Sequence, residues 1–280
     1  MESAERNAKR RTILTHIVLI LVSFIMIVPF AWMILTAVKT TQEAISVNPF
    51  YIFPHNGWHW ENFATVWKSY NFLILYKNTI LMIFFRVVCA CVTATMAGYA
   101  FGRLKFPLKK VLFLIVLIQM MVPAQIFIIP QYLMVSKLNM LNTTFGLVFP
   151  GLVTAFGTYL LKTGYEGLPK DLEEAAMIDG CNIGQRFLYI LMPLTRSSMI
   201  SLGIFTAVFA FKDLMWPMIV CTRAETTTLS AGLAKMQGQF SSNYPTMMAA
   251  AVLAVVPMVV IYVIFQKQFV EGIATSGGKL

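Results

Sequence analysis

The chain has 280 residues, of which 58% are hydrophobic and 12% are charged, and its mean hydropathy is +0.71. Soluble domains carry about 25% charged residues, so this composition excludes a water-soluble globular fold. The net charge of +10 does not indicate nucleic-acid binding, because the basic residues separate apolar segments instead of gathering on one face or in one tail. The composition is typical of a chain that crosses a lipid bilayer several times.

Six apolar segments are long enough to cross about 30 Å of hydrocarbon, which requires about 20 helical residues. We place these spans at residues 13–38, 78–101, 111–129, 144–161, 198–220 and 246–265. The first span follows four basic residues and lacks a small-residue cleavage site after it, so we interpret it as a retained helix and not as a signal peptide. The predicted fold class is all-α, a polytopic membrane protein with six transmembrane helices.

The distribution of basic residues predicts the orientation of these helices. Most of the 22 Lys and Arg residues fall in segments 1–12, 102–110, 162–197 and 266–280, which all lie on one side of the membrane if there are six spans. The positive-inside rule assigns that side to the cytoplasm, so both termini are predicted to be cytoplasmic. The expected organisation is a cytoplasmic tail (1–12), a first transmembrane helix (13–38), an external loop (39–77), a transmembrane core (78–265) and a cytoplasmic tail (266–280).

The external loop is rich in aromatic residues, and we expect its segment Glu61–Tyr70 to form an interfacial helix. One interpretation is that the aromatic side chains anchor this loop at the lipid headgroups. The other is that they contact an external partner protein.

Catalytic and metal-binding patterns are not found. The four cysteines form neither a CxxC motif nor a paired Cys/His spacing, so structural zinc is not supported. The segment nearest to a phosphate-binding loop, at 157–163, has Leu161 where the second glycine is required. We therefore expect a chain that is not an enzyme and that binds no cofactor or metal itself.

The cytoplasmic loop 162–197 has an unusually specific local pattern. Asp171 is expected to cap a short helix with Glu174 as its third residue, and Gly180 is a suitable left-handed stop. Asn182 and Gln185 can start a second helix that ends near Pro193. The first helix, about 12 Å long, is too short to be stable alone and needs a packing partner. A plain surface turn between two spans is the alternative on these features alone.

This loop resembles the EAA loop of bacterial binding-protein-dependent ABC importer permeases. The resemblance rests on residues Glu174, Ala175, Ala176, Gly180, Ile190 and Pro193. It implies that the loop forms a cytoplasmic coupling helix between the fourth and fifth spans, which docks onto a nucleotide-binding subunit and transmits its closure. Met192 stands where the family pattern usually has Leu, a volume-conserving difference.

Further segments are similar to the carbohydrate-importing, maltose permease MalG-like branch of this family. They are Phe211–Pro217, Thr228–Gln239 and Gln268–Gly272, with Phe211 and Lys212 departing from the Trp and Asn of the pattern. The resemblance implies a permease subunit in a bacterial plasma (inner) membrane. Its expected partners are two ABC ATPase subunits that bind ATP and Mg²⁺, a second homologous permease in a heterodimer, and an external solute-binding protein that delivers a sugar near loop 221–245.

Other functions stay open at this point. The solute could be a phosphorylated or acidic sugar derivative, and Lys212 favours this slightly. An ion-gradient secondary transporter would need no ATPase. A membrane-embedded enzyme would need polar catalytic groups clustered at one depth, which the sequence does not suggest.

Polar residues within the spans are candidates for the translocation path, because ionisable groups in a membrane usually face protein or water. Arg86, Lys212 and Asp213 are the charged ones, and Thr206 lies on the same helical face as Asp213, seven residues earlier. Gln119 is a weaker candidate, close to Pro123, which is expected to bend its helix. One hypothesis is that Thr206 and Asp213 face the translocation path or the seam with a second permease. The alternative is that the charge of Asp213 is neutralised by a buried partner within the fold.

Overall fold

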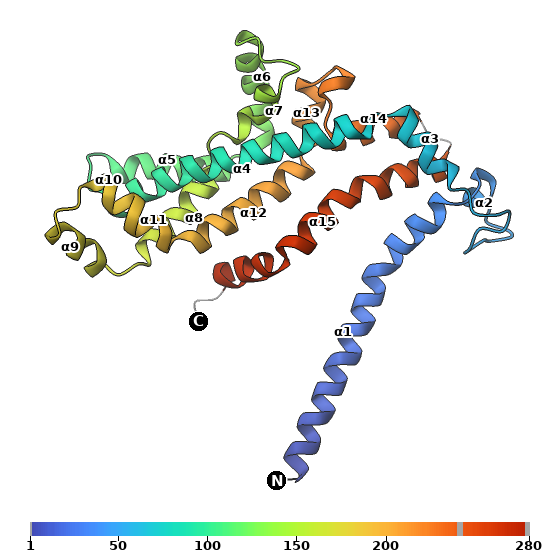
Figure 1. Ribbon diagram of the computed structural model, residues 1–280, viewed down its shortest axis with the longest axis horizontal. Helices are drawn as coiled ribbons and strands as arrows, with labels where there is room; N and C mark the ends of the chain where they lie inside the picture. Colours follow the sequence, from blue (N-terminus) through green and yellow to red (C-terminus); the bar gives the residue numbers. More distant parts are fainter. Residues whose placement is uncertain (1, 240–242, 278–280) are drawn as a thin grey trace. The chain divides into compact units, whose positions relative to one another are not determined.

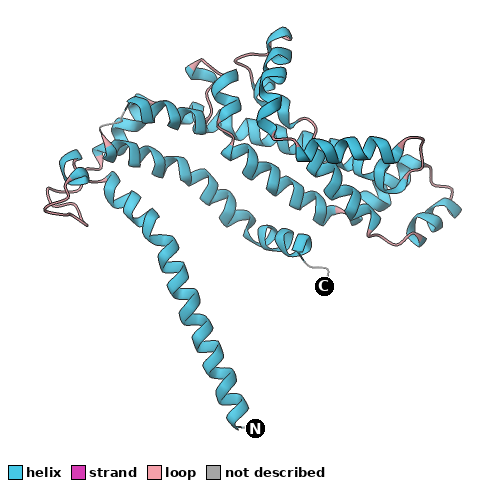
Figure 2. Ribbon diagram, turned by 180° about the vertical axis from the view of Figure 1, so that it is seen from behind, coloured by secondary structure: helices cyan, strands magenta, loops and turns pink. Residues whose placement is uncertain are grey.

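The structure is a computed structural model that describes residues 2–239 and 243–277, and within these ranges it contains helices and loops but no strand (Figures 1 and 2). The chain divides into two compact units, Met1–Asn71 with Leu233–Val256, and Phe72–Gly232 with Pro257–Leu280. The all-helical fold class predicted from the sequence is confirmed for the described residues.

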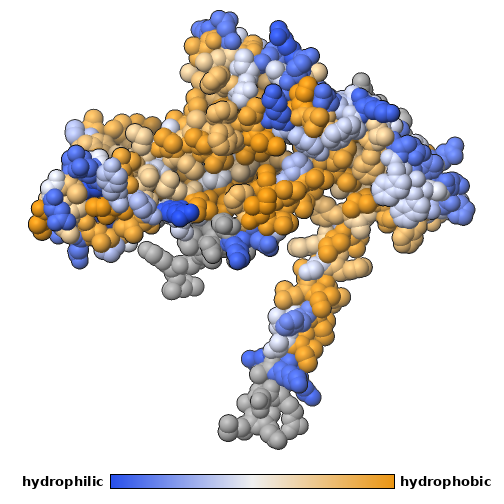
Figure 3. All heavy atoms as spheres, viewed as in Figure 1, coloured by the Kyte–Doolittle hydropathy of each residue, from blue (hydrophilic) through white to orange (hydrophobic). Residues whose placement is uncertain are grey.

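The first unit contains α1 (Glu2–Ala37), α2 (Thr41–Ile45), α3 (Glu61–Ser69) and parts of α14 (Leu229–Gln239) and α15 (Tyr244–Gly277). The segment Lys9–Ala37 is long and apolar enough to cross a membrane, and none of its most apolar window is buried within the chain. Figure 3 shows α1 covered by apolar side chains along most of its length, with hydrophilic ones near its N-terminus. Because apolar side chains exposed to water would be unfavourable, lipid is the natural solvent of this helix.

Three helices reach membrane-spanning length, namely α1, α4 (Phe72–Arg103) and the part of α15 over Tyr244–Lys267. Three pairs of shorter helices would also reach it if each bent pair is one span. They are Lys109–Met121 with Ala124–Lys137, bent by 101°, Thr144–Gly151 with Ala155–Glu166, bent by 50°, and Ile183–Leu194 with Arg196–Lys212, bent by 72°. The described residues thus hold three candidate spans, or up to six.

Three expected spans are not continuous helices, and in the segment 144–161 the chain bends by 50° between Thr144–Gly151 and Ala155–Glu166. The segment 111–129 breaks after α5 (Lys109–Met121), and the chain continues through a 3-10 turn at Ala124–Phe127 into α6 (Ile128–Lys137). Pro123 has no N–H to continue the α5 ladder, so the bend expected at this proline is present. The segment 198–220 breaks at Asp213, between α12 (Arg196–Lys212) and α13 (Met215–Val220).

The second unit is organised around α4, which packs along α8 (Ala155–Glu166) and α12. Gly98 makes the close approach of α4 and α8 possible, because a Cβ atom there would lie 2.6 Å from Leu161 Cβ and 2.8 Å from the Lys162 nitrogen. Two buried clusters flank this packing. One contains Ala94, Tyr99, Leu161, Tyr165, Leu191 and Leu202, and the other contains Met82, Val135, Leu147, Ala210, Trp216, Val220 and Cys221.

The loop between α8 and α12 contains α9 (Asp171–Ile178), α10 (Ile183–Gln185), a π-helix (Arg186–Leu191) and α11 (Met192–Leu194). The capping box of Asn182 and Gln185 is confirmed, with reciprocal bonds of 2.8 and 2.9 Å. Gly180 has the expected left-handed conformation, at φ +80°. The capping role of Asp171 was wrong, because Lys170 occupies the N-cap and Asp171 is already helical, where its carboxylate complements the helix dipole.

Candidate functional site

Helix α9 divides the residues of the predicted coupling motif between two faces. Ala176 is 3% exposed and packs inward, whereas Glu174 and Ala175 are exposed. The apolar side chains of Met177 and Ile178 are also exposed, Ile178 by 87%. An eight-residue helix with exposed apolar side chains is suited to docking into a groove on another protein.

Glu173 holds this helix to the rest of the second unit. Its carboxylate lies 3.4 Å from Arg186 Nη1 in the π-helix and 4.0 Å from Arg103 Nε at the end of α4. The three side chains are 13% (Glu173), 12% (Arg186) and 6% (Arg103) exposed, so water screens their charges weakly. The sequence reading selected the neighbouring Glu174 and missed Glu173, whose arginine partners are distant along the chain.

The remaining motif residues lie further along the same loop. Gly180 ends α9, Ile190 lies in the π-helix, and Pro193 is exposed in α11. Ile190 packs against the buried cluster that contains Tyr99 and Tyr165. The motif therefore runs from the exposed face of α9 to the packed core around α4.

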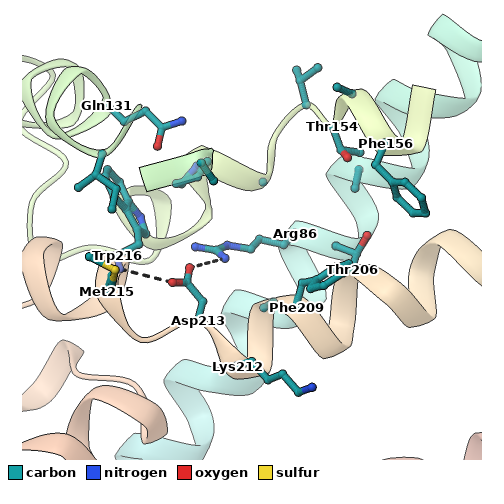
Figure 4. Close-up of a pocket in the computed structure, with 18 of the residues that line it drawn as sticks. Arg86, Gln131, Thr154, Phe156, Thr206, Phe209, Lys212, Asp213, Met215 and Trp216 are labelled. Carbon is teal, nitrogen blue, oxygen red and sulfur yellow. Dashed lines mark hydrogen bonds and ion pairs between the residues drawn. The ribbon is translucent and has the colours of Figure 1, made fainter. Parts of the chain in front are cut away.

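A cavity of about 660 Å³ lies in the second unit, at the break between α12 and α13. Its wall includes all five residues selected from the sequence as path candidates, Arg86, Gln119, Thr206, Lys212 and Asp213. Other lining side chains were not selected, because apolar rings and single polar residues carry no distinctive pattern in a span. Among them are Gln131, Thr154, Phe156 and Phe209. Figure 4 shows Gln131, Thr154, Phe156 and Phe209 around the Arg86–Asp213 pair, on several different helices and loops.

Asp213 lines this cavity and is also paired. Its Oδ2 accepts a hydrogen bond of 2.8 Å from Arg86 Nη1, while Arg86 Nε and Nη2 donate to the carbonyl of Leu147 at 3.0 and 2.6 Å (Figure 4). The Arg86 side chain is 8% exposed and that of Asp213 is 23% exposed. Asp213 therefore has a buried partner from α4, as one of the two interpretations expected, and it also lines the cavity.

The helix break at Asp213 is stabilised by its own hydrogen bonds. Asp213 Oδ1 accepts from the Trp216 nitrogen at 3.4 Å, as at the start of a helix, and Trp216 Nε1 donates to the carbonyl of Gly146 at 2.9 Å. Pro217 has no N–H to offer the Asp213 carbonyl four residues earlier, and Ser230 Oγ donates to that oxygen instead, at 2.6 Å. Two of the cavity's three charged side chains, Lys212 and Asp213, lie at this break, and the third, Arg86, comes from α4.

The loop after α1 contains a separate polar site within the first unit. The carboxylate of Glu43 accepts hydrogen bonds from the nitrogens of Thr40, His55 and Asn56 at 3.0, 2.9 and 2.7 Å. Burial alone would raise the pKa of Glu43, but these N–H groups stabilise its anion and lower the pKa to about 2. The neighbouring Lys39 is buried, donates to the Tyr51 carbonyl at 2.7 Å, and has a pKa lowered by burial. This site orders the loop.

The segment Glu61–Tyr70 largely forms the expected helix, α3. Its neighbours Trp58 and Trp60 are stacked and more than half exposed. The expected contact loop 221–245 includes residues 240–242, which lie outside the described residues. The side chains of the matched tail 268–272 also lie outside the described part.

Comparison with known proteins shows the family to which the chain belongs. The family described as binding-protein-dependent transport system inner membrane component matches residues 94–275. The chain belongs to this family. The match includes α9, the π-helix and α12–α13, so the coupling motif and the cavity lie largely within the family domain.

Individual relatives match over almost the whole chain. It is 28% identical to the arabinooligosaccharides transport system permease protein AraQ of Halalkalibacterium halodurans, over 92% of this chain and 93% of the relative. It is also 28% identical to the sn-glycerol-3-phosphate transport system permease protein UgpE of Salmonella typhi, over 96% and 98%. This binding-protein-dependent permease is therefore a transport component and not an enzyme.

A solved structure shares the fold. A chain from a bacterial ABC transporter involved in the import of the acidic polysaccharide alginate superposes with a TM-score of 0.78 at 20% sequence identity, covering 94% of this chain and 98% of that one. The two chains therefore share the same overall fold.

Proposed function

We propose that this permease imports a sugar or oligosaccharide across the bacterial inner membrane, as one of two different permease subunits in an ABC importer. AraQ, which matches over 93% of its length, is named for arabinooligosaccharides. The second substrate class is a phosphorylated or acidic sugar derivative, which is favoured by the match to UgpE and by Lys212 in the cavity wall. An external solute-binding protein delivers the solute.

The proposed topology has six spans with both termini in the cytoplasm. The three long helices and three bent pairs support the number of spans, and the basic residues of the intervening segments support their direction. The external loop 39–77 then contains the Glu43 site, and the coupling loop 162–197 is cytoplasmic. The domain boundaries are those expected from the sequence, with a core at 78–265.

Coupling to ATP is proposed to occur through α9. Two partner ATPase subunits bind ATP and Mg²⁺, and one of them grips the exposed face formed by Glu174, Ala175 and Ile178. Glu173 transmits the movement because it connects α9 to α4 and to the π-helix. The spans then alternate between inward- and outward-facing states. The observation that carries this proposal is that α9 exposes apolar side chains, among them Ile178, while Glu173 of the same helix bonds to the rest of the second unit.

The cavity at the α12–α13 break is the proposed solute path through this subunit. Its volume lies within the range of about 300–1,000 Å³ typical of small-molecule sites. Gln119, Gln131 and Thr154 offer hydrogen bonds for hydroxyl groups, and Phe156 and Phe209 offer ring faces for the apolar faces of sugars.

Reconstitution tests this function. The complete complex in proteoliposomes, given a hydrolysate of mixed polysaccharides and its solute-binding protein, should import saccharides only with ATP, as read by mass spectrometry of the lumen. Glu174→Lys should release the ATPase during detergent purification, whereas Lys170→Glu, just outside α9, should not. Saccharide uptake driven by an ion gradient without ATP would instead support a secondary transporter.

A further inference from the structure

The charged groups of the cavity do not balance. Arg86, Lys212 and Asp213 line it, and among the described lining residues Asp213 is the one acid. The cavity wall therefore carries one more positive than negative side chain. Ionisable side chains within membrane proteins usually pair with one another or line a water-filled cavity, so the excess positive charge is available to an anion.

Arg86 is already satisfied. Its Nη1 bonds the Asp213 carboxylate at 2.8 Å, and its Nε and Nη2 donate to the Leu147 carbonyl. Gly151 packs against this side chain, since a Cβ atom there would lie 2.6 Å from Arg86 Cγ. The guanidinium is thus fixed between α4 and the helix break, with its charge neutralised.

Lys212 is the charge that remains. It occupies the last turn of α12, and in Figure 4 its side chain points away from the Arg86–Asp213 pair. Within the described residues its ammonium group has no carboxylate within 4.0 Å, and its side chain is exposed. The negative end of the α12 dipole compensates this charge only weakly, because the position is exposed.

We propose that Lys212 binds an anionic group of the transported solute, a carboxylate or a phosphate, so that this importer selects acidic over neutral sugars. The inference rests on the proposed function and refines its substrate class. Asp213 does not compete for the lysine, because Arg86 holds its carboxylate. The glutamine and threonine side chains of the same wall bind the hydroxyl groups that acidic and neutral sugars share.

Direct binding to the purified complex tests this inference without the solute-binding protein. The probes are two matched pairs, digalacturonate with α-1,4-galactobiose, and glycerol 3-phosphate with glycerol. The wild-type complex should bind at least one anion about tenfold or more tightly than its neutral counterpart, since a charge-assisted bond is at stake. Lys212→Asn should remove this preference and leave the neutral probe unchanged, and Lys212→Arg should retain it. The preferred pair distinguishes carboxylate from phosphate.

Three results of the measurements on the purified complex would overturn the inference. The first is equal affinity for both members of each pair, and the second is failure of the wild-type complex to bind either anion. The third is that the Lys212→Asn complex loses the second permease while its solute preference is unchanged. In that case Lys212 pairs with a carboxylate of the second permease and not with the solute. ATP-driven uptake of neutral saccharides alone would refute the inference and leave the proposed function standing, whereas no ATP-driven saccharide uptake would refute the proposed function itself.

Discussion

Replacing Asp213 with alanine should destabilise the second unit by about 3 kcal/mol. The substitution leaves Arg86, with its side chain 8% exposed, without the anion that neutralises it. Removing one partner of a buried ion pair costs roughly 3–5 kcal/mol, and we take the lower end because the Asp213 side chain is 23% exposed. The bond from Trp216 adds little, since it is 3.4 Å long.

A double-mutant cycle separates this pair from other effects. Replacing both residues, Arg86→Met with Asp213→Ala, removes both charges and should cost far less than the two single substitutions together. We expect a coupling energy of at least about 2 kcal/mol, measured by circular dichroism as the complex unfolds in detergent with increasing denaturant. Additive single substitutions, within about 0.5 kcal/mol, would refute the reasoning that the two charges stabilise each other.

Three further predictions concern α9, the contact of α4 with α8, and the external loop. Glu173→Gln should lower the amount of solute transported per ATP hydrolysed by about tenfold, because α9 loses its ionic connection to α4. This factor corresponds to the coupling free energies of about 1–3 kcal/mol that are typical between two sites. Gly98→Ala should destabilise the chain by about 1–3 kcal/mol through overpacking, whereas Gly203→Ala, whose added Cβ would meet its nearest neighbour at an ordinary 3.5 Å, should not. The pKa of Glu43 is lowered from 4.5 to about 2, so its contribution to stability should be complete above pH 4.5 and lost as the pH falls toward 2.

Each of these predictions has a direct readout. Coupled ATPase and uptake assays on the same vesicles check Glu173, and an unchanged transport ratio would contradict its role. Unfolding curves compare the two glycine variants, and equal stability would contradict the close α4–α8 contact. Protease sensitivity of the external loop between pH 2 and 5 checks Glu43, with Glu43→Gln as the pH-independent control. A wild-type loop that stays equally resistant across this range would contradict the assignment.

Local signals in the sequence predicted the local features well. The capping box of Asn182 and Gln185 needs only four consecutive residues, and the left-handed Gly180 needs only a missing Cβ, so both were found. Pro123 marked the bend after α5 for the same reason. The cap assigned to Asp171 was wrong by one position, which is where helix ends are least determined by sequence.

Features that depend on tertiary partners could not be read in this way. The break of the fifth predicted span needs Arg86 and Ser230 to satisfy the Asp213 carboxylate and carbonyl, and both are distant in sequence. Pro217, four residues after Asp213, was a visible signal of that break. Glu173 was overlooked because nothing in its neighbourhood reveals that Arg103 approaches it from α4.

Site-specific photo-cross-linking tests the central claim that a partner ATPase grips α9. A photoreactive residue at Ile178, which is 87% exposed, should capture the ATPase subunit, and nucleotide should change the yield. The same residue at Val47, which is 84% exposed in the proposed external loop, should not capture it. Capture from position 178 would support the account, whereas capture from position 47 and not from 178 would place α9 away from the ATPase and contradict it.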